Sequence, residues 1–308
     1  PGSALLGMAA AQIYRALDAD AAQDVFHADC VRFGDGLPLT ADGRIGYPVP
    51  LSLHVPKREA PQFKEVVNVR NDAVADRSAS NQQFEQLRGG FITLDGDPVD
   101  VRTRSITKTA VDAGTGRAKG GQLFAYEAID AGQRFLCRID TPDGFDDRRL
   151  RAAFDGVRLL GRSRSAEFGR VRMQVFDAVS DLPASAPAAP GRLVLWCLSP
   201  LSLLDECGQP TLQVKGVHIG HPGATLDVSR SFIRTGRISR FNQHRHAYDP
   251  EQAVIARGSV LVFEGLPEGA VIGVALGEHR GVGFGRVTVN PSCLARDTFM
   301  IEPNPSRV

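Results

Sequence analysis

GRSRSAEFGRV at residues 161–171 and GEHRGVGFGRV at residues 277–287 align without a gap and share the pattern G-x-x-R-x-x-x-F-G-R-V. The two stretches lie roughly one domain length apart, so the repeat indicates duplication of a whole folding unit. Between them, residues 181–191 (DLPASAPAAPG) carry no helical or strand periodicity, which is typical of a linker. We therefore expect an N-terminal domain at residues 1–180 and a C-terminal domain at residues 192–308, joined by this linker.

The first half is expected to contain two helices and several strands. Apolar side chains at three- and four-residue spacing predict an amphipathic helix at residues 4–17, with Ser3 as its cap. A second helix is expected to begin at Asp146 and Asp147 and to run directly into the first glycine loop, with an apolar stripe formed by Leu150, Phe154, Val157 and Leu160. Alternating residues predict strands at 121–129, 134–139 and 171–176, the first two joined by a turn at 130–133.

This order of elements is that of a βαββαβ unit, the ferredoxin-like fold, without its first strand. The predicted fold class is therefore α+β, with two tandem ferredoxin-like domains, and the opening strand of the first domain is expected to lie upstream of residue 1. An insertion is expected around residues 58–117. In the second half we expect strands at 193–198, 258–263 and 287–289, while helices are harder to recognise there.

The composition is that of an ordinary globular protein, with 43% hydrophobic and 23% charged residues and a formal net charge of +1. Of the 36 basic residues, five are Lys and 31 are Arg, the residue suited to bidentate phosphate contacts. A GC-rich genome produces the same excess, and composition does not separate the two causes. The five cysteines are far apart and form no C-x-x-C pair, so we expect no metal and no cofactor. Without a long apolar run or a basic leader, a cytoplasmic location and no membrane partner are expected.

The two glycine loops are candidate phosphate sites. In the second loop, Gly281, Gly283 and Gly285 permit positive φ angles and a close backbone approach to phosphate, while Arg280 and Arg286 add charge-assisted contacts. In the first loop, Arg164, Gly169 and Arg170 match Arg280, Gly285 and Arg286, and Arg162 is a further candidate contact. Phe168 and Phe284 are expected in the core because F-G-R-V leads into a strand. The alternative is a tight turn that needs glycine for geometry alone, and Glu167 and Glu278 weaken each loop as an anion site.

A second basic segment, residues 230–246, holds five arginines and no acid, with two interleaved phenylalanines. This mixture of charge and aromatic rings suits single-stranded RNA, and we expect Arg234, Arg237 and Arg240 to contact phosphates, with His244 beside them. The alternative is a solvated strand face. The group of His244, His246 and Tyr248 also has the residue types of a metal-independent ribonuclease, in which His and Tyr act as general base and acid.

Five separated motifs carry a resemblance to a known family: residues 1–7 (PGSALLG), 32–39 (RFGDGLPL), 47–54 (YPVPLSLH) with Lys57, 121–124 (GQLF) and 277–291. Together they resemble the RAMP superfamily, the repeat-associated subunits of CRISPR-Cas effector complexes. The nearest resemblance is to the tandem-domain RAMP of subtype III-D, and the chain is also similar to subunits that cap the 5′ handle of the guide RNA in other type III complexes. The resemblance spans nearly the whole chain.

The resemblance implies two RRM-like, ferredoxin-like domains that bind RNA through the glycine loops. It also implies a thumb-like hairpin in the insertion, where Arg104 and Lys108 would touch RNA, with Ser3 and Lys57 as weaker contacts. The implied partners are the guide (CRISPR) RNA, other RAMP subunits, the large polymerase-like signature subunit and, indirectly, target RNA. The upstream strand that we expect would be the region in which backbone relatives carry a target-cleaving aspartate.

The function expected from the sequence is therefore that of a non-catalytic RNA-binding subunit in a ribonucleoprotein complex of antiviral defence, holding the 5′ handle of the guide. Two alternatives stay open. One is a metal-independent endoribonuclease that processes repeat RNA, and the other is a general single-stranded RNA-binding module.

Overall fold

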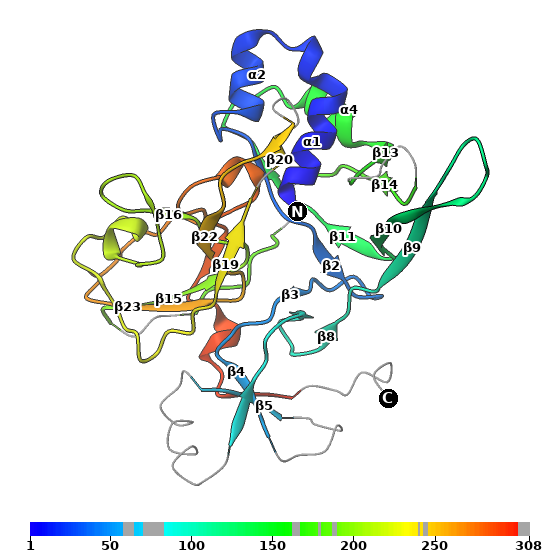
Figure 1. The fold of residues 1–308 in the computed structure, drawn as a ribbon. Coiled ribbons are helices and arrows are strands. Elements are labelled where there is room, and N and C mark those ends of the chain that lie inside the picture. The colour runs from blue at the N-terminus through cyan, green and yellow to red at the C-terminus, as the bar shows by residue number, and fades with distance from the viewer. Residues whose placement is uncertain are drawn as a thin grey trace.

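The computed structural model describes residues 1–57, 65–69, 83–161, 167–177, 180–186, 190–239, 241–242 and 246–300. Figure 1 shows a group of helices above a body of small antiparallel sheets, with one long hairpin projecting from the side. The helices of this group are α1 (Gly2–Ile13), η1 (Tyr14–Ala16), α2 (Ala19–Phe26) and α4 (Arg148–Phe154).

Two four-stranded antiparallel sheets form much of the body. The first has the order β18 (Thr225–Leu226), β23 (Val260–Glu264), β15 (Arg192–Cys197) and β24 (Val287–Val289). The second has the order β25 (Thr298–Met300), β5 (Glu65–Asn68), β4 (Leu53–Pro56) and β6 (Phe84–Gln86). A three-stranded sheet contains β3 (Tyr47–Pro48), β7 (Phe91–Ile92) and β8 (Pro98–Val99). The strands expected at 193–198, 258–263 and 287–289 are confirmed.

The remaining strands form antiparallel pairs. These are β1 (Arg32–Phe33) with β12 (Ile139–Asp140), β2 (Leu37–Leu39) with β11 (Arg134–Leu136), β9 (Thr103–Val111) with β10 (Ala118–Ile129), β13 (Gly156–Leu159) with β14 (Arg170–Met173), β16 (Leu203–Leu204) with β17 (Pro210–Thr211), β19 (Thr235–Ile238) with β22 (Gln252–Ile255), and β20 (Phe241–Asn242) with β21 (Ala247–Tyr248). Short 3-10 turns complete the described chain: η2 (Gly216–Ile219), η3 (Arg280–Val282) and η4 (Ser292–Ala295).

Strand β15 is buried on both faces, and its alternating side chains separate two hydrophobic cores. Leu193, Leu195 and Cys197 face one core together with Leu261 and Phe263. On the other face, the core joins residues from both halves of the chain: Tyr47, Leu53 and Ile92 from the first half, and Val194, Trp196, Val260 and Val262 from the second. This core therefore contains residues from both sides of the predicted linker. The division into two domains stays a prediction.

A third core packs the helices against one another and against β1. Leu5, Met8 and Ala9 of α1 pack against Leu150 and Phe154 of α4, together with Val25 and Phe33. The predicted helix at 4–17 is confirmed as α1 followed by one 3-10 turn, but Ser3 does not cap it. Pro1 occupies the cap position, and Ser3 is an exposed residue inside the helix.

Three further expectations need correction. The second helix ends at Phe154, because Gly156 adopts a positive φ of 92° and opens strand β13. The first glycine loop therefore joins two strands of a hairpin rather than a helix to a strand. Strand β10 pairs with β9, not with the strand that follows the turn at 130–133, and β11 pairs with β2 instead.

The architecture is mixed α and β, as predicted, but a tandem ferredoxin-like arrangement is not confirmed. A βαββαβ unit needs two helical crossovers. Between residues 190 and 300, the described positions contain 3-10 turns and strands but no α-helix, and the two central strands β15 and β23 run antiparallel. Among the described residues, no helix combines the length and the apolar character that a membrane crossing requires.

Candidate nucleic-acid interface

The second glycine loop folds against the start of α1 and the end of β1. A Cβ atom built at Gly2 would lie 1.7 Å from the carbonyl oxygen of Phe33 and 2.7 Å from that of Val282. One built at Gly283 would lie 2.7 Å from the same oxygen of Phe33. Asp35 strengthens this contact, because its carboxylate accepts a hydrogen bond of 2.7 Å from the backbone N–H of Gly2. Three of the sequence motifs therefore meet at one place in the fold, which we call the glycine junction (residues 1–3, 33–35 and 280–285).

The backbone N–H groups of the loop glycines already have partners inside the chain. Gly281 donates to the carboxylate of Asp29 at 2.8 Å, Gly283 to the carbonyl of Arg280 at 3.0 Å and Gly285 to the carbonyl of Pro200 at 2.7 Å. The expectation that these amides point at a phosphate is therefore not met. Crowding explains the glycines instead, since a Cβ at Gly285 would lie 1.8 Å from a neighbouring carbonyl oxygen.

The two arginines of this loop have different surroundings. Arg286 forms a buried ion pair with Asp181, with Nη2 2.7 and 2.6 Å from the two carboxylate oxygens. Its side chain is 16% exposed and that of Asp181 only 3%, so Arg286 is not available as the predicted phosphate contact. Arg280 is exposed at the glycine junction, and no carboxylate partner is found for it among the described residues.

Asp181 is the centre of a larger polar group. Arg138 donates to Asp181 at 3.2 Å, and its hydrogen bond to Asp140 raises the pKa of its guanidinium. The hydroxyl of Tyr47 donates to the backbone carbonyl of Asp181 at 3.1 Å. Burial, with a smaller contribution from the Asp181 carboxylate, raises the pKa of Tyr47 to about 12. This group fixes the residue that opens the predicted linker against β3.

In the first glycine loop, residues 162–166 lie outside the described part of the chain, and Arg162 and Arg164 are among them. Gly169 is buried, and its carbonyl accepts a hydrogen bond of 2.7 Å from Leu160. Arg170 is exposed. Phe168 is 50% exposed with a positive φ of 60°, so the prediction that it lies in the core is wrong. Phe284 is half-buried against the ring of His279.

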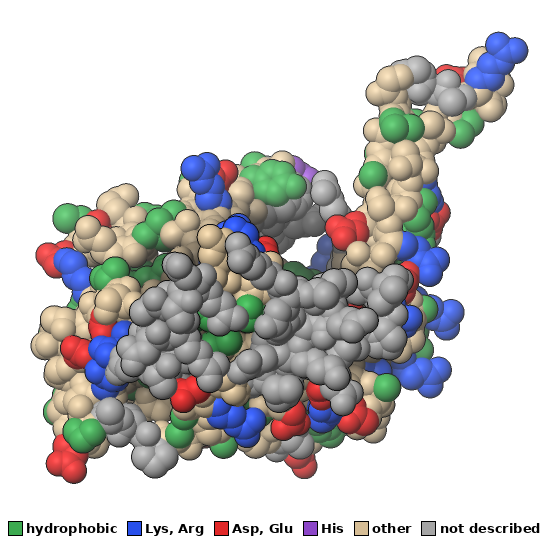
Figure 2. Space-filling view, turned by 90° about the horizontal axis from the view of Figure 1, so that it is seen from below, with side chains coloured by type: hydrophobic (Ala, Val, Ile, Leu, Met, Phe, Trp, Pro, Cys, Tyr) green, Lys and Arg blue, Asp and Glu red, His purple; other side chains and the backbone are tan. Residues whose placement is uncertain are grey.

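The long hairpin of β9 and β10 stands out from the body as an arm (Figure 2). On one of its faces Lys108 lies opposite Phe124, and the Phe124 and Tyr126 rings are 5.5 Å apart. The Lys108 ammonium lies 5.8 Å from the Tyr126 ring centre and 5.9 Å from that of Phe168, and it also forms an ion pair with Glu167. Hairpin and first glycine loop therefore form one surface, the aromatic hairpin face (Lys108, Phe124, Tyr126 and Phe168).

Two of these aromatic residues were missed as binding candidates. The alternation of residues 121–126 (GQLFAY) predicts a strand with Phe124 and Tyr126 on the same face. This shared face is the sequence signal that could have identified them as binding candidates. Arg104, on the same hairpin, forms an ion pair with Asp130, so its charge is compensated within the chain. Lys57 and Ser3 are exposed, and nothing in the structure gives either of them a more specific role.

The basic segment does not form a row of surface arginines. Arg237 is 80% exposed but pairs with Glu251 at 3.0 Å. Arg234 turns inward and donates to the backbone carbonyl of Arg88, and its Nη2 atom is buried without a hydrogen-bond partner. Arg240 and His244 lie outside the described residues. Arg234 and Arg237, the two described members of the predicted set, therefore do not form adjacent phosphate contacts.

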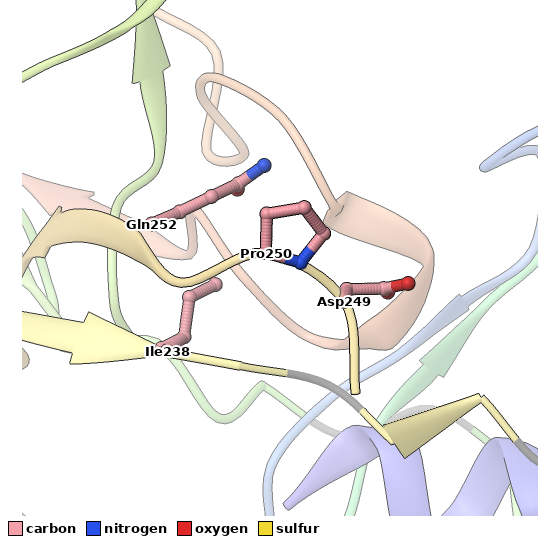
Figure 3. Close-up of a pocket in the computed structure, with 4 residues that line it drawn as sticks. All are labelled: Ile238, Asp249, Pro250 and Gln252. Atoms are coloured by element: carbon pink, nitrogen blue, oxygen red, sulfur yellow. The ribbon is translucent and has the colours of Figure 1, made fainter. Parts of the chain in front are cut away.

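Strand β19 of this segment and its partner β22 lie close to the glycine junction. The ring Nε2 of His279 is 3.0 Å from the side-chain oxygen of Gln252. Ile238, Asp249, Pro250 and Gln252 line a shallow pocket of about 170 Å³ at this end of the two strands (Figure 3).

The described residues show no catalytic arrangement that supports the ribonuclease alternative. His246, with a positive φ of 48°, and Tyr248 are both exposed. Across the described residues, no group of three or more His, Cys, Asp or Glu side chains is arranged to hold a metal ion.

No protein-family model matches the chain. No curated protein sequence matches it either. Among solved structures, the chain is similar to a chain in "Cryo-EM structure of the Type III-B Cmr-beta bound to cognate target RNA and AMPPnP, state 1", with 13% identity, a TM-score of 0.48, and 85% of this chain and 76% of that chain covered. A second similar chain, in "Cryo-EM structure of the Type III-B Cmr-beta bound to cognate target RNA", has 12% identity, a TM-score of 0.46 and coverages of 85% and 74%.

Proposed function

We propose that this chain is a non-catalytic RNA-binding subunit of a type III CRISPR effector complex, in which it holds the 5′ repeat-derived handle of the guide RNA. The proposal includes the subtype III-D assignment, a cytoplasmic location, and contacts with other RAMP subunits and the large polymerase-like subunit. It rests first on the sequence motifs that resemble the RAMP superfamily.

The observation that carries the proposal is the glycine junction. Motifs at the start of the chain, at residues 32–39 and near its end contact one another through glycines that admit no side chain. Exposed Arg280 lies at this junction without a carboxylate partner in the described chain. An arginine held on a rigid, closely packed loop is suited to a phosphate contact, because little loop entropy remains to be lost on binding.

The aromatic hairpin face supports the same ligand. Phe124 is 41% exposed and Phe168 is 50% exposed, so both rings offer surface on which an unpaired base can stack. Stacking surfaces beside a basic side chain are a common way of binding single-stranded RNA without reading its sequence. A preference of the protein for repeat RNA over other RNA would then have to come from the glycine junction.

The test is binding of the purified chain to end-labelled repeat RNA and to a scrambled RNA of equal composition, without added metal. We expect a repeat-selective gel shift and, on a denaturing gel, intact RNA. Equal affinity for both RNAs would favour a general single-strand-binding module. Discrete cleavage that is lost in His246→Ala or Tyr248→Phe would overturn the non-catalytic assignment.

A further inference from the structure

We propose that Arg88, Arg234 and Arg257, the arginine cluster, form a second contact for the phosphodiester backbone of single-stranded RNA. That the ligand is RNA rests on the proposed function; the site itself rests on the contacts described below.

Three segments distant in sequence bring these arginines together. The backbone N–H of Ala256 donates to the carbonyl of Arg234 at 2.7 Å, which places Arg257 beside Arg234. The Arg234 guanidinium in turn donates to the carbonyl of Arg88. The Arg257 guanidinium lies 5.0 Å from the centre of the Phe91 ring, only three residues beyond Arg88.

The charge of this cluster is not compensated within the described residues. No carboxylate there pairs with any of its three arginines, whereas Arg237 and Arg286 each have one within about 3 Å. One nitrogen of Arg234 is buried and has no hydrogen-bond partner among the described residues. This nitrogen is out of contact with water and has no counter-charge among the described residues, so an anion bound at the surface beside it gains more than it would on an ordinary solvated arginine.

The exposed members have the chemistry of a phosphate contact. Arg88 and Arg257 are both exposed. The ring of Phe91 orients the Arg257 guanidinium and leaves its N–H groups available for bidentate hydrogen bonds to a phosphate. Fixed in this way, Arg257 loses little freedom when it binds.

The position of the cluster also fits a continuous strand of RNA. Strands β19 and β22 pair from Thr235 with Ile255 at the cluster end to Ile238 with Gln252 at the other, where Gln252 contacts His279, the residue directly before the glycine junction. Four paired residues span roughly 10 Å at the usual rise per residue. The two contacts are therefore a few nucleotides apart, and one single strand can reach both.

The experiment measures binding of fluorescein-labelled oligouridine to the full chain by anisotropy over a range of salt concentrations. The variant R88E/R257E is compared with R15E/R149E, which reverses two exposed arginines near α1 and α4 and changes the net charge equally. We expect R88E/R257E to weaken binding at least tenfold and to lower the salt slope by about 1.4, the loss of two phosphate contacts to a single strand. The control should keep the wild-type slope.

Equal affinity and slope in the two variants would overturn the arginine cluster as an RNA site, as would absence of oligouridine binding by the wild type; a site for an acidic protein partner would give that result. R88Q/R257Q provides the same comparison if charge reversal prevents folding, which a thermal melt reveals. Oligouridine has no repeat sequence, so this outcome is separate from the repeat preference that tests the proposed function.

Discussion

At the scale of single residues, the ion pair between Asp181 and Arg286 is the interaction whose loss should matter most for stability. Asp181→Ala leaves a mostly buried guanidinium without its counter-charge, and we expect the free energy of unfolding to fall by about 3 kcal/mol. Urea denaturation measures this change. Glu206→Ala, which removes an exposed partner of Lys215, should have no measurable effect. Similar losses in the two variants would contradict the structural role of Asp181.

The same pair shows what the sequence could and could not predict about residues. Sequence reasoning identified Arg280 and Arg286 as equivalent phosphate contacts, because a loop pattern contains residue types but not their partners. Asp181 is more than a hundred positions away and was interpreted as the start of a linker, yet it binds Arg286 and leaves Arg280 as the exposed arginine of the loop. Long-range pairing of charges is a property of the folded chain and has no local pattern.

At the scale of elements, the turn before β24 depends on a close backbone approach. Gly285→Ala adds a Cβ only 1.8 Å from the carbonyl oxygen of Leu276, at a φ of 76°. Gly132 has a similar φ of 84° but open space around it, so Gly132→Ala reports the cost of the backbone conformation alone, about 1 kcal/mol. We expect Gly285→Ala to cost several times more in chemical denaturation. Equal costs would show that the turn relaxes freely.

The long hairpin should matter for RNA binding and not for the fold. Most of its described side chains are exposed, and Thr107 lies directly opposite Ala125. Joining these two residues by an Asn-Gly turn removes Lys108 and Phe124 and keeps the base of the hairpin. We expect a nearly unchanged melting temperature and an RNA affinity about tenfold lower, in line with the loss of one stacked base. Unchanged affinity would exclude the aromatic hairpin face as a contact.

Elements were predicted better than their partners. Strands β10, β15, β23 and β24 lie where the sequence predicted strands, because runs of strand-forming and apolar residues are local properties. The partner of β10 was wrong: the hairpin turn at residues 130–133 was assigned to join the paired strands, whereas the pairing partner, β9, precedes β10. Alternation gives the face of a side chain but not the neighbouring strand.

At the scale of the whole molecule, one core joins the two halves that the repeat divides. Tyr47 packs against Trp196 with ring centres 5.8 Å apart, and β25 pairs with β5. We therefore expect a single cooperative transition in calorimetry, with equal calorimetric and van't Hoff enthalpies. Two separate transitions, reproduced by chains cut within residues 181–191, would show instead that the predicted domains fold independently.

The central claim is that RNA binds at the glycine junction and the aromatic hairpin face. Photocrosslinking of the full chain to repeat RNA that contains 4-thiouridine, followed by mass spectrometry of the linked peptides, tests it most directly. The account predicts crosslinks in peptides that contain residues 1–7, 280–286 and 121–126, with lower yields for scrambled RNA. Crosslinks confined to other surfaces, such as α2 or the β16–β17 pair, would contradict it.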